Sequence, residues 1–487
     1  MEYQSTRDKN ITASPVRAVL EGIAPGGGLY VADPSEIPFD WKELMDLSAV
    51  EMSARILSAL LPGFDDMEGL VKESYRGKFE TEDLTPLVKV GDRYVLELFR
   101  GPTCAFKDVA LSVLPRLITA GRAAEGAKGE AVILTATSGD TGKAALEGFH
   151  DVPGTRIVVF FPYKGTSKVQ ELQMTTQKGA NVKVCAVRGN FDDAQTGVKK
   201  IFTGVTEEEL GGKTLSSANS INIGRLAPQV MYYFKAYSDL LKEGAIALGD
   251  EVFFVVPTGN FGDILAGYYA KLMGLPVAKL ICASNKNRVL TDFLSTGFYD
   301  RRREFYKTES PSMDILVSSN LERLLWLATR DEEKVSGFMK SLSSEGFFRA
   351  DEELLGKIKE SFACGCASDE EGETSIGKVF KDYGYLMDPH SAVAWNVSES
   401  FMEEAAGRPV VILSTASPYK FPAACLKALG EEPSEGEFEQ MERLRELTGV
   451  PVPENLSSLK DAKVLHSDVI DKDKMKDYVL KALGENK

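Results

Sequence analysis

The chain has 487 residues, which is too long for one hydrophobic core, so two or three domains are expected. Its formal net charge of −15 argues against a nucleic-acid partner, because nucleic-acid-binding proteins carry a basic patch or stripe. The N-terminal residues are polar, and no apolar run is long enough to span a bilayer, so we expect no membrane partner. The six scattered cysteines favour a reducing compartment, and we predict a cytoplasmic protein.

Histidine is scarce in this sequence. Only His150, His390 and His466 are present, and they are far apart. A Ser-His-Asp triad or a multi-histidine metal site is therefore poorly supported. Cys364 and Cys366 form a Cys-x-Cys without a second cluster, so we predict no metal. If the protein is an enzyme, proton transfer falls to lysine, carboxylate or a cofactor.

The first 95 residues differ in pattern from the rest of the chain, and we interpret 1–95 as an N-terminal accessory domain. Gly26 to Gly28 followed by Leu29 to Val31 indicates a turn and then a strand. The stretch from Leu44 to Leu61 is amphipathic and predicts either a pair of helices or one bent helix.

A lysine lies in an unusual setting just after this region. Tyr94 to Phe99 predicts a strand, and Val109 to Ile118 predicts a helix with a kink at its proline. Between them, Lys107 stands in Gly-Pro-Thr-Cys-Ala-Phe-Lys-Asp, next to apolar residues. Desolvation would lower its pKa and make the amine nucleophilic, as Schiff-base chemistry requires. Taken alone, a surface lysine with a buried stem explains this segment better.

Strands and helices alternate between residues 130 and 290, and a further strand follows late in the chain. Short buried strands separated by helices predict parallel βαβ units in an open α/β sheet. The predicted strands are Ala131–Thr135, Arg156–Phe161, Val182–Val187, Glu251–Val256, Ala278–Ala283 and Val410–Leu413. The predicted helices between them are Lys143–Phe149, Ser167–Lys178 and Ile264–Met273.

Three polar or glycine-rich segments follow predicted strands, at 137–142, 257–263 and 414–418. In open α/β sheets, ligands bind beyond the carboxyl ends of the strands. The second segment can place several backbone N–H groups around one anion at a helix N-terminus. It lacks the features of a Walker A loop and of a dinucleotide fingerprint. A tight turn with a capped helix is the alternative for each segment in isolation.

The later part of the chain is more charged. Residues 340–375 have helical spacing, and the acidic run Asp369 to Glu373 predicts a solvated loop. The pattern after residue 430 is helical. We therefore predict an α/β catalytic core at 96–430, divided into two subdomains, and a C-terminal helical segment at 431–487.

A reactive lysine, a phosphate cup, a second anion loop and the neutral hydroxyl of Thr415 are the parts that pyridoxal 5′-phosphate (PLP) needs. At this point the sequence resembles the threonine synthase family, in the tryptophan-synthase-β-like group of PLP enzymes (fold type II). The resemblance runs in order from Ser5 to Ala416. Its motifs include Ser5-Thr6-Arg7, Ala24 to Val31, Gly101 to Asp108, Thr137 to Gly142, Gln170 to Thr176, Asn219 to Arg225, Gly259 to Asp263, Asp388-Pro389-His390 and Ser414-Thr415-Ala416.

The resemblance implies two open α/β domains with the cofactor between them, plus the N-terminal accessory region. It implies that Lys107 binds the cofactor as a Schiff base and later moves protons. The implied cofactor contacts are Asp140, Thr415 at the pyridine nitrogen, and the cup Gly259, Asn260, Phe261, Gly262 and Asp263. The implied contacts to the substrate and its leaving phosphate are Ser138, Thr141, Asn219, Ser220 and Arg225.

The implied reaction converts O-phospho-L-homoserine and water to L-threonine and phosphate, by γ-elimination and then β-addition. It is the last step of threonine biosynthesis. The resemblance departs at Ser417, where the family more often has a histidine, and His390 could be structural. A β-eliminating PLP enzyme and a PLP-binding regulatory protein are the rival interpretations, although Arg225 argues for a phosphorylated substrate. A monomer or a homodimer is expected.

Overall fold

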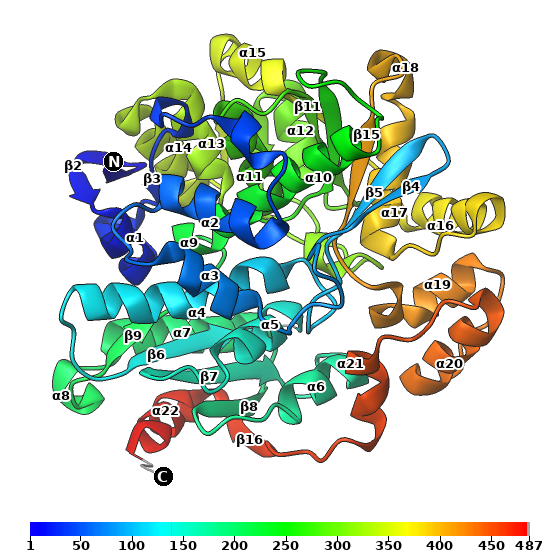
Figure 1. Cartoon of the computed structure of the whole chain (residues 1–487). Coiled ribbons are helices and arrows are strands. Elements are labelled where there is room, and N and C mark those ends of the chain that lie inside the picture. Colours follow the sequence, from blue (N-terminus) through cyan, green and yellow to red (C-terminus); the bar gives the residue numbers. More distant parts are fainter. Residues whose placement is uncertain (138, 485–487) are drawn as a thin grey trace.

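Residues 1–137 and 139–484 are described by a computed structural model, in which two parallel sheets dominate (Figure 1). The larger sheet has six strands in the order β14-β11-β10-β15-β5-β4, and all its pairs are parallel except β4 with β5. The bounds are β4 (Leu87–Val90), β5 (Arg93–Glu97), β10 (Val252–Pro257), β11 (Val277–Ser284), β14 (Phe362–Cys366) and β15 (Val410–Ser414). The α/β fold predicted from the sequence is confirmed.

The smaller sheet has five parallel strands in the order β16-β8-β7-β6-β9, and it lies at the lower side of Figure 1. Its strands are β6 (Ala131–Ala136), β7 (Thr155–Pro162), β8 (Val182–Arg188), β9 (Thr214–Ser216) and β16 (Asp468–Asp471). Two short antiparallel sheets complete the strands. They contain β1 (Tyr3–Ser5), β2 (Asp8–Ala13) and β3 (Tyr30–Val31), and β12 (Phe298–Asp300) and β13 (Phe347–Arg349).

Helices cover both faces of the sheets, which explains why the central strands are apolar throughout. All six residues of β10 and all five of β15 are buried. The helices before residue 250 are α1 (Pro15–Glu21), α2 (Ala49–Leu60), α3 (Met67–Tyr75), α4 (Lys107–Ala124), α5 (Asp140–Phe149), α6 (Lys168–Thr175), α7 (Phe191–Gly204), α8 (Glu207–Leu210), α9 (Ile223–Leu226) and α10 (Val230–Lys242).

The later helices continue the same alternation around the larger sheet. They are α11 (Gly262–Leu272), α12 (Val289–Thr296), α13 (Leu321–Thr329), α14 (Glu332–Ser344), α15 (Glu352–Ser361), α16 (Asp369–Tyr383), α17 (Pro389–Glu399), α18 (Met402–Ala405), α19 (Pro422–Ala428), α20 (Glu437–Thr448), α21 (Glu454–Ser457) and α22 (Met475–Gly484). In the described part of the chain, no helix combines the length and apolar character needed to cross a bilayer.

Two predicted elements are wrong in type or extent. The acidic run from Asp369 is the first turn of α16, not a loop, because Ser368 caps the helix and Glu371 completes a capping box. Acidic residues in a first turn also favour the helix dipole. The amphipathic stretch from Leu44 contains one helix, α2, preceded by a short 3-10 turn that ends at Leu44.

The C-terminal segment is not purely helical. β16 pairs in parallel with β8 and forms an edge of the smaller sheet. The predicted domain boundaries at 95 and 430 stay a prediction, and the sheets cross both of them. β4 and β5 belong to the larger sheet, and β16 belongs to the smaller one.

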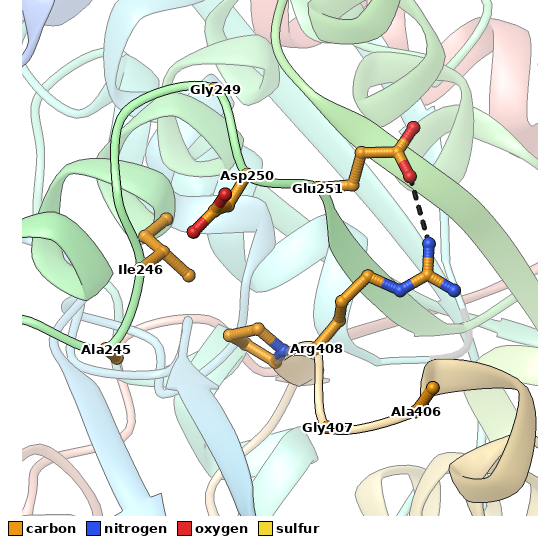
Figure 2. Close-up of a pocket in the computed structure, with 9 residues that line it drawn as sticks. Ala245, Ile246, Gly249, Asp250, Glu251, Ala406, Gly407 and Arg408 are labelled. Carbon is orange, nitrogen blue, oxygen red and sulfur yellow. Dashed lines mark hydrogen bonds and ion pairs between the residues drawn. The ribbon is translucent and has the colours of Figure 1, made fainter.

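A surface hollow lies at the amino ends of β10 and β15, where Arg408 forms an ion pair with Glu251 (Figure 2). Both side chains are exposed, and ligands of open α/β sheets bind at the opposite, carboxyl edge. The hollow therefore does not contain the candidate site.

Candidate functional site

The turn that carries Lys107 is held at the end of the late strand β15. β5 and β15 are parallel neighbours, so the loops that follow them emerge at the same edge of the sheet. The backbone N–H of Phe106 donates to the carbonyl of Thr415 at 2.9 Å, and that of Ser417 donates to the carbonyl of Cys104 at 3.1 Å. The predicted lysine and the predicted neutral hydroxyl residue therefore come together.

Lys107 begins α4 and is largely buried, with 11% of its side chain exposed. Its Nζ lies 3.9 Å from a carboxylate oxygen of Asp140 and 4.4 Å from the centre of the Phe106 ring. Burial lowers the pKa of Lys107 to about 8, although Asp140 opposes the shift; Lys420 and Arg225 add to it. The amine is therefore half deprotonated at about pH 8, far below the pH at which an ordinary lysine loses its proton.

Asp140 is shared between two lysines. Lys420 Nζ donates to its Oδ1 at 2.5 Å and also to the carbonyl of Thr103 at 3.2 Å, while Lys107 faces its Oδ2. Burial alone would raise the pKa of Asp140, but the ammonium groups of Lys420 and Lys107 outweigh it and hold that pKa well below its usual range. The carboxylate therefore stays ionised in the interior.

Lys420 was not among the residues predicted from the sequence. Its side chain is fully buried, on the short turn Pro418–Lys420 after β15. The available signal was a lysine between Tyr419 and the apolar start of α19, the same kind of setting that singled out Lys107. Lysine is almost never fully buried unless it is paired, so such a position marks an internal ion pair.

The predicted phosphate cup is a turn between β10 and α11. Phe261 has a φ of +62°, and its ring packs against that of Phe362, with 5.7 Å between the ring centres. It can therefore offer the cup only its backbone. A side chain at Gly259 would meet the carbonyl of Ser312 at 2.6 Å. The first N–H groups of α11 have no acceptor within the helix, and they face the same turn. Gly259, Asn260, Phe261 and Gly262 therefore form a turn that leads into a helix N-terminus, a place where a protein could hold an anion.

The side chain of Asp263 turns away from this role. Its Oδ1 accepts hydrogen bonds from the hydroxyls of Tyr232 at 2.5 Å and Tyr233 at 2.9 Å, and its Oδ2 is buried with no partner in the part of the chain that the structure describes. Burial raises the pKa of Asp263 to about 6, against the lowering effect of these two hydrogen bonds. Any part that Asp263 has in the cup is limited to its backbone.

Arg225 is a buried cation with an unused donor. Its Nη1 donates to the carbonyl of Ala218 at 2.8 Å, whereas its Nε is buried and has no partner among the described residues. Burial lowers the pKa of Arg225 to about 10. Asn219 is exposed and Ser220 is half-buried on the loop before α9, where the Ser220 hydroxyl donates to Asn219 Oδ1 at 3.3 Å. The three predicted phosphate ligands thus belong to one segment.

Thr141, another predicted substrate contact, lies at the start of α5, close to Thr137 in the sequence. The hydroxyl of Thr137 accepts hydrogen bonds from the backbone N–H groups of Gly139 and Gly142, each at 3.0 Å. Thr141 is half-buried in the first turn of α5. Ser138 lies outside the described residues, so its predicted contact has no structural test here.

His390 has a structural position. Its Nε2 accepts a hydrogen bond from the backbone N–H of Ser312 at 3.1 Å, which places its proton on Nδ1. That Nδ1 lies 2.6 Å from Asp388, the residue that caps α17. The histidine thus holds the turn at Ser312, whose carbonyl oxygen lies close to Gly259.

Comparisons with known protein families match nearly the whole chain. Residues 2–75 match "Threonine synthase N terminus", residues 81–415 match "Pyridoxal-phosphate dependent enzyme", and residues 391–470 match "Threonine synthase, C-terminal". The "Threonine synthase" of Saccharomyces cerevisiae is 37% identical over 88% of this chain and 89% of its own length. That of Pseudomonas aeruginosa is 38% identical over 89% of this chain and 92% of its own length.

Another group of relatives is longer. Human "Threonine synthase-like 1" is 40% identical over 85% of this chain, but the match covers only 57% of the human protein.

Among solved structures, PLP-bound threonine synthase from Brucella melitensis has a TM-score of 0.89 and 38% identity, with each chain covered completely. Threonine synthase from yeast has a TM-score of 0.88 and 34% identity, covering 99% of this chain and 98% of its own.

Proposed function

Because this chain belongs to the threonine synthase family of pyridoxal-phosphate-dependent enzymes, we propose that it converts O-phospho-L-homoserine and water to L-threonine and phosphate. The reaction is a γ-elimination followed by addition of water at the β-carbon. The position of Lys107 carries the proposal. It is a largely buried amine that faces a buried carboxylate, within electrostatic reach of the buried Arg225.

The residues present fit PLP. Lys107 provides the primary amine for its aldehyde, and the glycine turn before α11 provides backbone donors for its phosphate. Gly259 suits this turn because any side chain there would strike Ser312. Thr415, buried at the end of β15, would face the pyridine nitrogen as a neutral partner. When bound, PLP supplies an electron sink for breaking bonds at the α- and β-carbons.

Lys107 Nζ is the group that takes and returns protons in this proposal. A pKa of about 8 makes both its protonated and its neutral form accessible near neutral pH. When Lys107 gains a proton, the ionised Asp140 stabilises the new charge. Lys420 limits that stabilisation because its ammonium already neutralises the same carboxylate.

Arg225 would bind the leaving phosphate through its unpartnered Nε, helped by Asn219 and Ser220. Hydrogen bonds from a guanidinium to a phosphate are charge-assisted and strengthen as charge grows on the leaving group. Ser138 and Thr141, the second of which lies in the first turn of α5, would bind the substrate carboxylate or phosphate. Asp140 would lie near the 3′-oxygen of the cofactor, where relatives in the wider group carry an asparagine.

A phosphate-release assay tests the proposal. The purified protein, loaded with PLP, should release phosphate from O-phospho-L-homoserine but not from phosphothreonine, and it should form threonine. Deamination of serine is measured in parallel, because a β-eliminating enzyme of the same fold would catalyse it. Serine deamination without phosphate release, or neither reaction in a PLP-loaded protein, contradicts the proposal.

We also propose a cytoplasmic location and a monomer or homodimer with no nucleic-acid or membrane partner. The six cysteines are all free thiols and are buried or half-buried, which suits a reducing compartment. Fractionation of cells that express the full chain and light scattering of the purified protein test these points. A larger assembly or recovery in the membrane fraction contradicts them.

A further inference from the structure

The start of α13 contacts both N-terminal sequence motifs, whose role the site chemistry leaves open. Glu322 accepts hydrogen bonds from Thr6 Oγ1 at 2.5 Å and from Arg7 Nε and Nη2, each at 2.7 Å. The next residue, Arg323, donates from Nε to the carbonyl of Tyr30 at 2.9 Å. Two neighbouring side chains of α13 therefore hold the Ser5-Thr6-Arg7 motif and the strand that comes after Gly28.

Arg323 also reaches the loop that contains the predicted phosphate ligands. Its side chain is fully buried, and its Nη2 donates to the carbonyl of Ile221 at 2.5 Å while its Nη1 donates to Asn320 Oδ1 at 2.5 Å. In the part of the chain that the structure describes, no carboxylate forms an ion pair with it. Burying a guanidinium without a carboxylate is costly, so its three oxygen acceptors must be held in place to satisfy it.

Asn320 extends this connection to the cofactor loop. Its side-chain amide donates to the carbonyl of Asn260 at 3.0 Å and to that of Ser220 at 3.2 Å. Its backbone N–H also donates to the carbonyl of Asn260 at 3.1 Å. An amide group has two hydrogens, so one side chain orients both loops.

The N-terminal region contacts the substrate loop at a second point. Asn222 Nδ2 donates to the carbonyl of Val19 in α1 at 2.9 Å. The Oδ1 of the same side chain accepts the backbone N–H of Gly224 at 2.8 Å and caps α9, the helix that carries Arg225. The position of Arg225 therefore depends on α1 as well as on α13.

We propose that Asn320 and Arg323 are a positioning pair that aligns the two anion-binding loops, 219–222 and 259–263, with each other and with the N-terminal region. The inference rests on the proposed function, because the two anions are the cofactor phosphate and the leaving phosphate. Since one amide orients both loops, an anion bound in one loop strengthens binding in the other, and the effect is reciprocal.

Asn320→Asp tests the shared amide directly. The variant keeps an oxygen for Arg323 but replaces the donor with an oxygen that faces two carbonyl groups. Two properties of the full-length PLP-loaded protein are measured. They are the affinity for inorganic phosphate and the rate of PLP loss with and without saturating phosphate. In the wild type, phosphate should slow PLP loss. In the variant, both ligands should bind about tenfold more weakly and phosphate should no longer slow PLP loss.

Arg7→Met provides a second variant that leaves both loops untouched. The Arg7 side chain is 31% exposed, and the substitution removes its ion pair with Glu322. The affinities for PLP and for phosphate should both fall in Arg7→Met, by a smaller factor than in Asn320→Asp. The matched control is Arg17→Met, which removes an exposed arginine of α1 that pairs with Glu21 and Glu125, and it should change neither affinity. If Asn320→Asp does not fold, the comparison of Arg7→Met with Arg17→Met tests the positioning role.

The outcomes separate the two proposals. A wild-type protein that takes up neither PLP nor phosphate refutes the proposed function itself. If the wild type binds both ligands, the positioning role is refuted in three cases. These are variants that bind both ligands like the wild type, variants that lose only one of them, and a wild type in which phosphate does not slow PLP loss.

Discussion

Burial changes Lys107 from a surface cation into an amine that is half deprotonated at about pH 8. Charged groups face it from several elements: Asp108 on its own helix, Asp140, Arg225, Asp263 and Lys420. Asp140 and Asp108 favour its protonated form, but burial dominates, so the net shift is downward. Below its pKa, the fraction of free amine falls about tenfold for each pH unit.

We therefore expect capture of PLP by the PLP-free protein to rise with pH, with a midpoint of about 8. Borohydride reduction after brief mixing, followed by peptide mapping, measures the pyridoxyl group on Lys107 at each pH. A label on Lys143 or Lys164 instead contradicts the assignment. A midpoint near 10.5, the value of an ordinary lysine, contradicts the effect of burial.

The buried pair of Lys420 and Asp140 gives a prediction about stability. Lys420→Met leaves an ionised carboxylate in the interior with only Lys107, 3.9 Å away, as a counter-charge. Breaking a buried pair in this way costs about 3–5 kcal/mol. Urea unfolding should show that loss, whereas Lys427→Met should have a much smaller effect, because it removes an exposed lysine of α19 that pairs with Glu309 and Glu373. Equal effects of the two substitutions would contradict the role assigned to Lys420.

At the level of elements, the turn between β10 and α11 depends on close backbone approach. A methyl group at Gly259 would lie 2.6 Å from the carbonyl of Ser312, so one of the two loops must move. Gly259→Ala should therefore weaken PLP binding by at least about tenfold, as measured by absorbance titration of the PLP-free protein. The control is Gly337→Ala in α14, where the added methyl group meets nothing within 4 Å. Unchanged affinity in Gly259→Ala would show that the turn does not hold the phosphate.

The elements that the sequence predicted well are those with a strong local pattern. β10 and β15 are continuous apolar runs bounded by turn residues, and both were predicted within one or two residues. β16 was missed because Asp468 to Asp471 has only two apolar residues, and because it pairs with β8, which is distant in the sequence (Asp468 lies opposite Cys185). The acidic start of α16 was misread because a charge run is compatible with both a loop and a capped helix.

For the whole molecule, the sequence predicted the loops that hold the candidate site residues. It did not predict the distant residues that hold those loops in place. Glycine turns after strands identified the two anion loops, and an apolar setting identified Lys107. The support comes from residues distant in sequence: Lys420 reaches Asp140, and Arg323 reaches Tyr30 and Ile221. A local pattern can mark Lys420 as unusual, but it does not predict which residues pair, because tertiary packing alone brings the partners together. The N-terminal region also contacts the loop that leads to Arg225, through the hydrogen bond from Asn222 to the carbonyl of Val19.

The most direct test of the proposed reaction follows the oxygen atoms. The PLP-loaded protein is incubated with O-phospho-L-homoserine in ¹⁸O-labelled water, and the products are analysed by mass spectrometry. Elimination breaks the bond between the γ-carbon and oxygen, and water then adds at the β-carbon. Threonine should therefore carry one ¹⁸O in its hydroxyl group, and the released phosphate should carry none. Labelled phosphate together with homoserine, or a keto acid without threonine, would contradict the account.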